Sequence, residues 1–138
     1  MIPGFKNETV IELQLYTMKK NWKKCAEPNQ CPVRTVLDRL GDKWSVLVIL
    51  LLGEKGAVRF SHIKNEIGDV SQKMLTITLK TLEADGIVNR QVFAEVPLRV
   101  EYSLTERGET LLPHIQQLTA WANQNMRQIL KDRKQYVS

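Results

Sequence analysis

The sequence predicts a mainly α-helical protein of the α+β class, in which one small β-hairpin interrupts the helices. Apolar residues recur every three or four positions through most of the 138-residue chain, which is the spacing of one helix face. Two short runs, 87–94 and 99–104, are instead rich in β-branched and aromatic residues, and they flank a link that contains a proline. No repeat or long linker divides the chain, so we expect a single domain over residues 1–138.

The composition narrows the classes of protein that the chain can be. A hydrophobic content of 43% argues against disorder, and a net charge of +5 suits a polyanionic partner. The first ten residues do not form a signal peptide, and the longest apolar run, 44–52, is too short to span a bilayer. We therefore expect a cytoplasmic protein with no membrane partner.

The candidate metal ligands are few and scattered. Cys25 and Cys31 lack the paired spacing of a zinc site, and His62 and His114 are isolated in the sequence. We expect no metal and no cofactor. In the cytoplasm both cysteines should be reduced thiols at rest.

The first predicted helix is an N-terminal extension over residues 1–24. Thr9 and Glu12 form a capping box at its start. Four apolar residues then fall on one helical face, at spacings of four, three and four. They are Ile11, Leu15, Met18 and Trp22.

Two further helices are predicted before the hairpin region begins. One opens at Cys31-Pro32, because proline is favoured at the first helical position, and ends at Gly41. Its buried face should consist of Val33, Val36, Leu37 and Leu40. The next helix covers 44–52 and should stop at Gly53 and Gly56.

Three elements follow. They are a short strand at 58–60, a helix at 61–67 capped by Ser61, and a helix from Ser71 to about Asp85. Leucines 75, 79 and 82 form the buried stripe of the last of these helices, and Gly86 stops it. The strands at 87–94 and 99–104 then form the hairpin. Thr105 caps a C-terminal helix over about 105–131.

The apolar stripe of the C-terminal helix is longer than one small domain can cover, so part of it should contact a second subunit. The four apolar residues of the first helix are expected to join that interface. The candidates on the C-terminal helix are Leu111, Ile115, Leu118, Trp121, Met126 and Ile129.

Helix, turn, helix and adjoining hairpin is the element order of a winged helix-turn-helix, here with a core at 31–104 and dimerisation helices at both ends. This module places its second helix in the major groove of DNA. Lys73, Ile77 and Lys80 should lie opposite the buried leucines, with Gln72 and Thr76 on the flank. Amide and ammonium groups can bind base edges or phosphates, and an apolar side chain can touch a thymine methyl.

The full set of candidate DNA contacts adds the helix cap and three arginines. Arg90 and Arg99 lie in the wing, where an arginine can reach DNA or pair across the strands with Glu95 or Glu101. Arg59 can contact phosphate or brace the fold. The alternative for the helix is an ordinary solvated face. The set is Arg59, Ser71, Gln72, Lys73, Thr76, Ile77, Lys80, Arg90 and Arg99.

Cys31 occupies the N-cap position before Pro32, where free backbone amides and the helix dipole favour a thiolate. The lowered pKa would make Cys31 a sensor of oxidants or electrophiles, with Cys25 as its resolving partner. The alternative is a small apolar residue that packs the start of the helix.

Over about residues 31–121, a series of short motifs in a fixed order resembles the HxlR-type winged-helix regulators, which are relatives of the MarR group. The matching pieces are Cys31-Pro32-Val33, Gly41-Asp42-Lys43-Trp44, Arg59-Phe60, Ser71-Gln72-Lys73-Met74-Leu75, Leu82-Glu83-Ala84-Asp85-Gly86, Val96-Pro97, Val100-Glu101-Tyr102-Ser103-Leu104-Thr105 and Trp121.

The resemblance implies a homodimeric DNA-binding regulator without enzymatic activity, and several similar members sense reactive compounds through a cysteine at the position of Cys31. The helix before Cys31 is longer than the usual family pattern, so its role is not carried over. Two other functions stay open. One is a winged helix used only for protein–protein contact, and the other is a small thiol enzyme, for which no histidine motif supplies a base.

Overall fold

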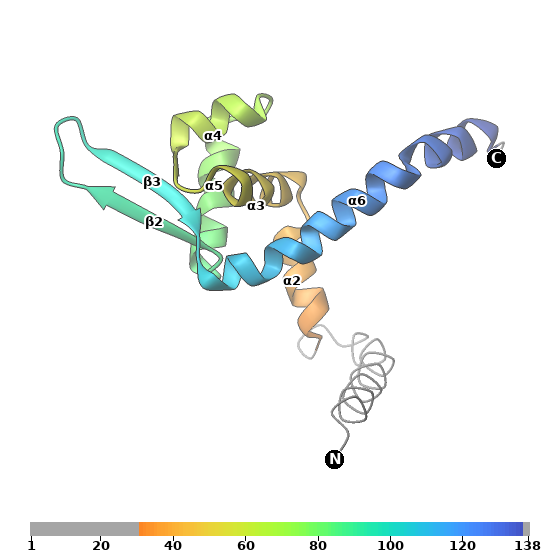
Figure 1. Cartoon of the computed structure of the whole chain (residues 1–138), viewed down its shortest axis with the longest axis horizontal. Helices are drawn as coiled ribbons and strands as arrows, with labels where there is room; N and C mark the ends of the chain where they lie inside the picture. The colour runs from red at the N-terminus through yellow and green to blue at the C-terminus, as the bar shows by residue number, and fades with distance from the viewer. Residues whose placement is uncertain (1–30, 137–138) are drawn as a thin grey trace, which may run out of the picture. The chain divides into compact units, whose positions relative to one another are not determined.

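The computed structural model describes residues 31–136 (Figure 1). The first predicted helix, with Ile11, Leu15, Met18 and Trp22, lies outside the described residues. The chain divides after Gly41 into two units, residues 1–41 and 42–138. Each unit is therefore described by itself.

Helix α2, Pro32–Leu40, begins as the sequence predicts. Cys31 is its N-cap, and the Cys31 sulfur accepts a hydrogen bond from the backbone N–H of Arg34 at 3.2 Å. Pro32 occupies the first helical position, where no N–H is required. Gly41 is the C-cap, so both predicted ends of this helix are confirmed.

The predicted buried face of α2 is wrong for the single chain. None of its residues is buried, and Val33, Val36 and Leu37 are 56%, 45% and 58% exposed. Periodicity identifies the apolar face of a helix, but it does not say whether that face is covered within one chain or by another surface.

Helix α3, Lys43–Lys55, is the centre of the second unit and contacts α4, α5, α6 and β3. Asp42 caps it by accepting a hydrogen bond from the N–H of Ser45 at 2.9 Å. The predicted stop at Gly53 is wrong, because the helix continues to Lys55 and ends at Gly56. Gly53 instead permits close packing, since a Cβ there would stand 2.6 Å from the side chain of Leu112.

Strand β1, Val58–Arg59, leads directly into helix α4, Phe60–Ile67. Phe60 is thus helical rather than part of the strand. The predicted cap at Ser61 is also wrong, because the helix begins one residue before it. The N-cap is Arg59, which makes no side-chain capping bond.

Helix α5, Gln72–Ala84, follows the predicted cap Ser71, whose Oγ accepts a hydrogen bond from the N–H of Met74 at 3.0 Å. Leu75, Leu79 and Leu82 are buried, as predicted. Gly86 follows the helix with a φ of 71°, a left-handed conformation that favours glycine.

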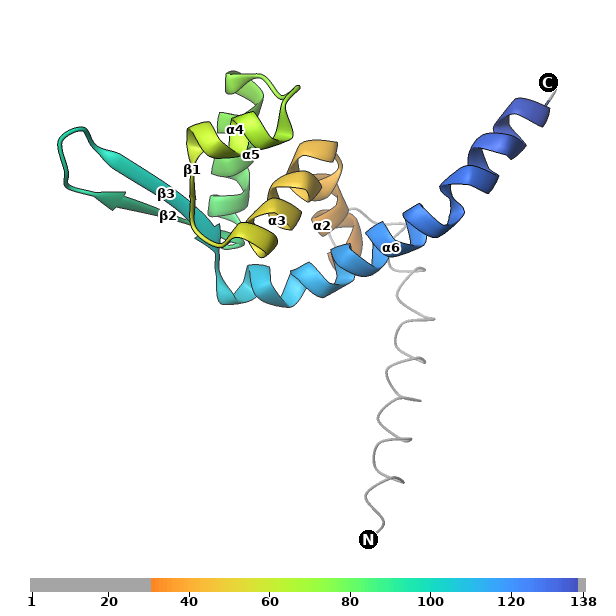
Figure 2. The same cartoon turned by 45° about the horizontal axis from the view of Figure 1, so that its top comes forward.

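Strands β2, Val88–Phe93, and β3, Arg99–Leu104, form the predicted hairpin. With β1 they make a three-stranded antiparallel sheet in the order β1-β3-β2. Figures 1 and 2 show the outer part of the hairpin, the wing, extending away from the helices of this unit.

Helix α6, Glu106–Gln135, runs past α3, and its C-terminal half extends beyond the other helices of the unit (Figure 2). Its predicted cap is confirmed, because Thr105 Oγ1 accepts a hydrogen bond from the N–H of Gly108. The same hydroxyl lies within hydrogen-bond distance of the carbonyl oxygens of Gly86 and Ile87. Arg107 donates to the Asp85 carbonyl at 2.9 Å, so the start of α6 is joined to the end of α5.

Between residues 31 and 136, no helix combines the length and the apolar character that crossing a bilayer requires.

Candidate nucleic-acid interface

The exposed face of α5 presents the side chains that the sequence predicts. Gln72, Lys73 and Lys80 are exposed, Thr76 is half-buried, and Ile77 is 48% exposed. The placement of these residues is confirmed, and their contact with DNA stays a prediction.

The DNA-contact candidates of α5 fall into two neighbouring stripes. Gln72, Thr76 and Lys80 are spaced by four residues and lie one above another, and Lys73 and Ile77 form the adjacent pair. The hydroxyl of Thr76 donates to the Gln72 carbonyl at 2.8 Å. The helix therefore offers two different surfaces rather than one uniform basic face.

The first stripe borders an open hollow between α5 and the sheet, which we call the α5–wing hollow. Its volume is about 460 Å³. The residues that line it are Phe60, Gln72, Thr76, Leu79, Lys80, Glu83, Arg90 and Tyr102. Lysine and arginine thus reach the same hollow from a helix and from a strand.

Register places Arg90 beside Tyr102. The two residues are direct partners across β2 and β3, so their side chains lie on the same face of the sheet. Within residues 31–136, neither Arg90 nor Lys80 takes part in an ion pair. Both cations of the hollow therefore keep their charge available for a ligand.

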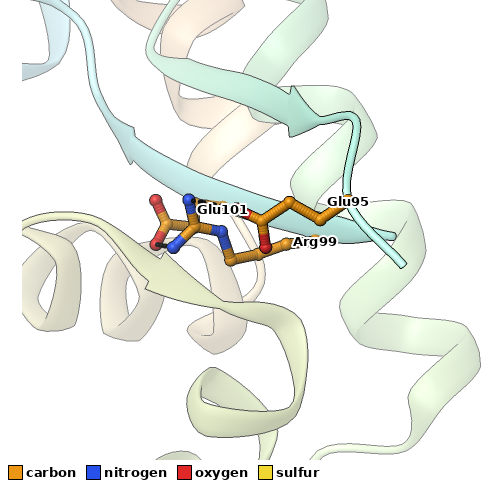
Figure 3. A network of polar contacts seen from close by, with 3 residues as sticks. All are labelled: Glu95, Arg99 and Glu101. Atoms are coloured by element: carbon orange, nitrogen blue, oxygen red, sulfur yellow. Dashed lines mark ion pairs between the residues drawn. The ribbon is translucent and has the colours of Figure 1, made fainter. Parts of the chain in front are cut away.

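Arg99, the other wing arginine, is held by carboxylates of the wing itself (Figure 3). Its guanidinium lies 3.1 Å from Glu95 and 3.8 Å from Glu101, and it stacks 4.0 Å from the centroid of the Phe93 ring. Glu95 and Glu101 are the partners that the sequence offers as the alternative to a DNA contact, but the predicted pairing across the strands is wrong. Glu101 is on β3 with Arg99, and Glu95 lies in the link before β3. Arg99 braces the wing in this structure.

The tip of the wing carries apolar rather than basic side chains. Val96 is fully exposed, and Leu98 is 64% exposed. The neighbouring Glu95 forms an ion pair with Arg99. Arg90 is the wing cation that remains without a carboxylate partner among the described residues.

Arg59 lies apart from the α5–wing hollow. It lines a second hollow of about 510 Å³ with Ser61, His62, Asn65, Glu66 and other residues around the start of α4. The structure therefore does not bring Arg59 together with Lys80 and Arg90. His62 pairs with Glu66 on the same helix at 3.4 Å.

The predicted interface residues of α6 separate into two groups. Ile115 is buried within the chain, Leu111 and Ile129 are half-buried, and Leu118, Trp121 and Met126 are 60%, 56% and 42% exposed. Leu130, at 48% exposure, extends the second group and was not predicted. The N-terminal part of the stripe belongs to the core, and the exposed part remains available to a partner.

Cys31 is buried, at 1% exposure, and disulfide-bonded. The sequence predicts a thiol here from the cellular compartment alone, so the structure differs from that expectation. Compartment is a general argument that says nothing about local geometry. Cys25, the other cysteine of the chain, lies outside the described residues.

In the part of the chain from 31 to 136, no three residues among His, Cys, Asp and Glu gather in a way that could hold a metal ion.

Sequence reasoning did not identify Tyr102, Glu83 and Phe60 as neighbours of the DNA candidates. Tyr102 becomes a neighbour only through the register of the two strands, and sequence patterns do not determine register across the five-residue link 94–98. Glu83, however, lies three residues after Lys80 on the same helix, so helical spacing alone could have found it.

A helix-turn-helix made of α4 and α5, followed by the β2–β3 wing, defines the class of winged helix-turn-helix proteins. Residues 39–130 match the HxlR-like helix-turn-helix family. The chain therefore belongs to the HxlR family of helix-turn-helix transcriptional regulators.

Individual relatives agree with this assignment. The chain is 43% identical over 94 residues to the uncharacterised HTH-type transcriptional regulator BH0655 of Halalkalibacterium halodurans. The aligned region covers 68% of this chain and 83% of the relative. It is similar to the redox regulator HypR in its oxidised form, with 43% identity, a TM-score of 0.64, and coverage of 69% and 97% of the two chains. A MarR-family transcriptional regulator from Porphyromonas gingivalis W83 gives 36% identity, a TM-score of 0.65, and coverage of 70% and 93%.

Proposed function

We propose that this chain is a sequence-specific DNA-binding transcriptional regulator that acts as a homodimer on a pseudo-palindromic operator. The observation that carries the proposal is the exposed face of α5 beside the wing, with Lys73, Ile77 and Lys80 on the helix and Arg90 across the hollow. Helices of this class lie in the major groove. The family assignment supports the same role.

The side chains of α5 and α4 have different parts in this proposal. Gln72 and Lys73 stand at the start of the helix, where they can donate hydrogen bonds to base edges, and Ile77 offers an apolar surface to a thymine methyl. Ser71 and Arg59 are phosphate contacts that position the domain. Arg99 acts indirectly, by holding the wing.

A symmetric operator requires two copies of α5. We propose that the exposed apolar residues of α6, namely Leu118, Trp121, Met126 and Leu130, form part of the contact between the copies. The predicted contribution of Ile11, Leu15, Met18 and Trp22 belongs to the same proposal. In this organisation, residues 31–104 are the DNA-binding core, and the segments 1–24 and 105–135 join the subunits.

The proposal is tested by selecting duplexes from a random DNA library with the full-length protein. We expect enrichment of an inverted repeat. Lys73→Ala should weaken binding to the enriched duplex by about 1–3 kcal/mol and relax its base preference, since a lysine that reads a base contributes on that scale. A library that shows no enrichment would instead favour a protein–protein role for the winged helix.

We further propose that the regulator responds to oxidants or electrophiles through Cys31. Three features support this: the N-cap position of Cys31, the disulfide in which it takes part, and the similarity to HypR, which is described as a redox regulator. Two thiols that form a disulfide lose two electrons and two protons to the oxidant. Cys25 is the proposed second thiol.

The redox proposal is tested by treating the protein with diamide and measuring its binding to the enriched duplex. Wild type should change affinity on treatment and recover with dithiothreitol, whereas Cys31→Ser should bind equally well in both states. Non-reducing electrophoresis distinguishes an intrachain from an intersubunit disulfide. A wild type whose affinity is insensitive to diamide would leave Cys31 with a purely structural role.

The proposal assigns no enzymatic activity and no cofactor to the chain, and it places the regulator in the cytoplasm with its DNA.

A further inference from the structure

The α5–wing hollow is lined by two cations, Lys80 and Arg90, that can bind an anion together. We infer that the hollow seats a single backbone phosphate, bound jointly by Lys80 from α5 and Arg90 from β2. The inference rests on the proposed DNA binding and adds a division of labour between the two stripes of α5.

The first step is the position of the two cations. Lys80 and Arg90 belong to different elements, are both exposed, and line one hollow. They have no ion-pair partner among the residues that the structure describes. Two like charges that face a common space repel each other, and an anion between them removes that repulsion.

The second step is the chemistry of the remaining walls. Tyr102 lies beside Arg90, so its phenol adds a donor for phosphate oxygens. Glu83 lines the same space and partly offsets the two cations. The floor is apolar, with Leu79 and Phe60, which offers no competing acceptor from a side chain.

The third step is the path of the DNA backbone. If α5 lies in the major groove, the wing on the other side of the hollow lies toward the neighbouring groove. A phosphodiester strand separates the two grooves, so it passes between helix and wing. The open hollow lies at that crossing and can accept a phosphate of a continuous chain. Lys73 and Ile77 lie on the other stripe and remain free for base edges.

This arrangement predicts a characteristic dependence on salt. Each neutralised phosphate contributes a slope of about 0.9 to the plot of log affinity against log salt concentration. If Lys80 and Arg90 share one phosphate, either cation alone still neutralises it. Lys80→Ala and Arg90→Ala should then each leave the slope nearly unchanged, whereas the double variant should lower it by about 1.8 for a symmetric two-subunit site.

Two separate phosphates give a different result. Each single variant should then lower the slope by about 1.8, and the double variant by about 3.6. That result would overturn the inference while leaving the proposed function intact. Failure of wild type to enrich any duplex would instead overturn the proposed function itself. Thermal unfolding of each variant checks that the fold is unchanged.

Methylphosphonate substitution provides the second measurement, because it removes the charge of one phosphate at a time. A scan across the enriched half-site should reveal one position at which neutralisation makes Lys80→Ala and Arg90→Ala indistinguishable from wild type. Lys73→Ala is the matched control, and it should still weaken binding on that modified duplex. If the Lys80 and Arg90 variants are silenced at two different phosphates, the shared site is refuted.

Discussion

Replacing Trp121 with alanine should weaken the proposed dimer more than any other single change in the exposed part of α6. A tryptophan side chain offers up to about 250 Å² for burial, so 56% exposure leaves roughly 140 Å² in the single chain. At about 25 cal/mol per Å², that area is worth about 3.5 kcal/mol in each subunit. If the partner covers half of it, the two copies together contribute about 3.5 kcal/mol.

Because about 1.4 kcal/mol corresponds to a factor of ten, the dissociation constant of the dimer should rise about 300-fold. Sedimentation equilibrium over a range of concentrations measures this constant. Leu98→Ala is the control, since it also removes an exposed apolar side chain but lies on the wing. Equal dissociation constants for wild type and Trp121→Ala would refute the reasoning and exclude this part of α6 from the interface.

Two further predictions concern the elements that position α5 and the wing. Thr105→Val should lower the free energy of unfolding by about 1–2 kcal/mol, because it removes the cap of α6 and the hydroxyl beside the carbonyls of Gly86 and Ile87. Calorimetry should give a melting temperature about 5–10 °C lower. Thr105→Ser should recover most of the lost stability, because it keeps the hydroxyl. A melting temperature of Thr105→Val equal to that of wild type would contradict this role. Arg99→Ala removes two partly exposed ion pairs, so its effect on global stability should stay below about 1 kcal/mol. Amide hydrogen exchange at 94–98 should nevertheless accelerate, and unaltered exchange there would mean that Arg99 does not hold the wing.

Most helix boundaries of the described chain could be predicted from the sequence, because local capping chemistry determines them. Cys31, Ser71 and Thr105 all cap the helices that their side chains predict. Gly53 was misread because its role is packing against Leu112, a contact 59 positions away in the sequence. Local patterns carry no information about such a contact.

The candidate site was predictable to a similar extent. Helical periodicity placed Lys73, Ile77 and Lys80 on the exposed face of α5, as the structure has them. It did not separate the two stripes of that face, because their difference depends on where the wing lies. The partners of Arg99 were named as alternatives, but the choice between carboxylates and DNA needed the three-dimensional arrangement of the hairpin.

Burial of apolar stripes was the least predictable property. The apolar residues of α2 and of the C-terminal half of α6 satisfy the same periodicity as those of α5, yet they are exposed in the single chain. A stripe that packs within the chain and one that meets a second subunit have the same sequence pattern.

Hydroxyl-radical footprinting of the enriched duplex, combined with the stoichiometry of the complex, tests the central claim most directly. Two subunits that each place α5 in the major groove should protect two symmetric half-sites about 10 base pairs apart on one face of the helix. The complex should contain two chains per duplex. One chain per duplex with a single unsymmetrical footprint would contradict the homodimeric regulator, and the absence of any protection would contradict DNA binding by α5.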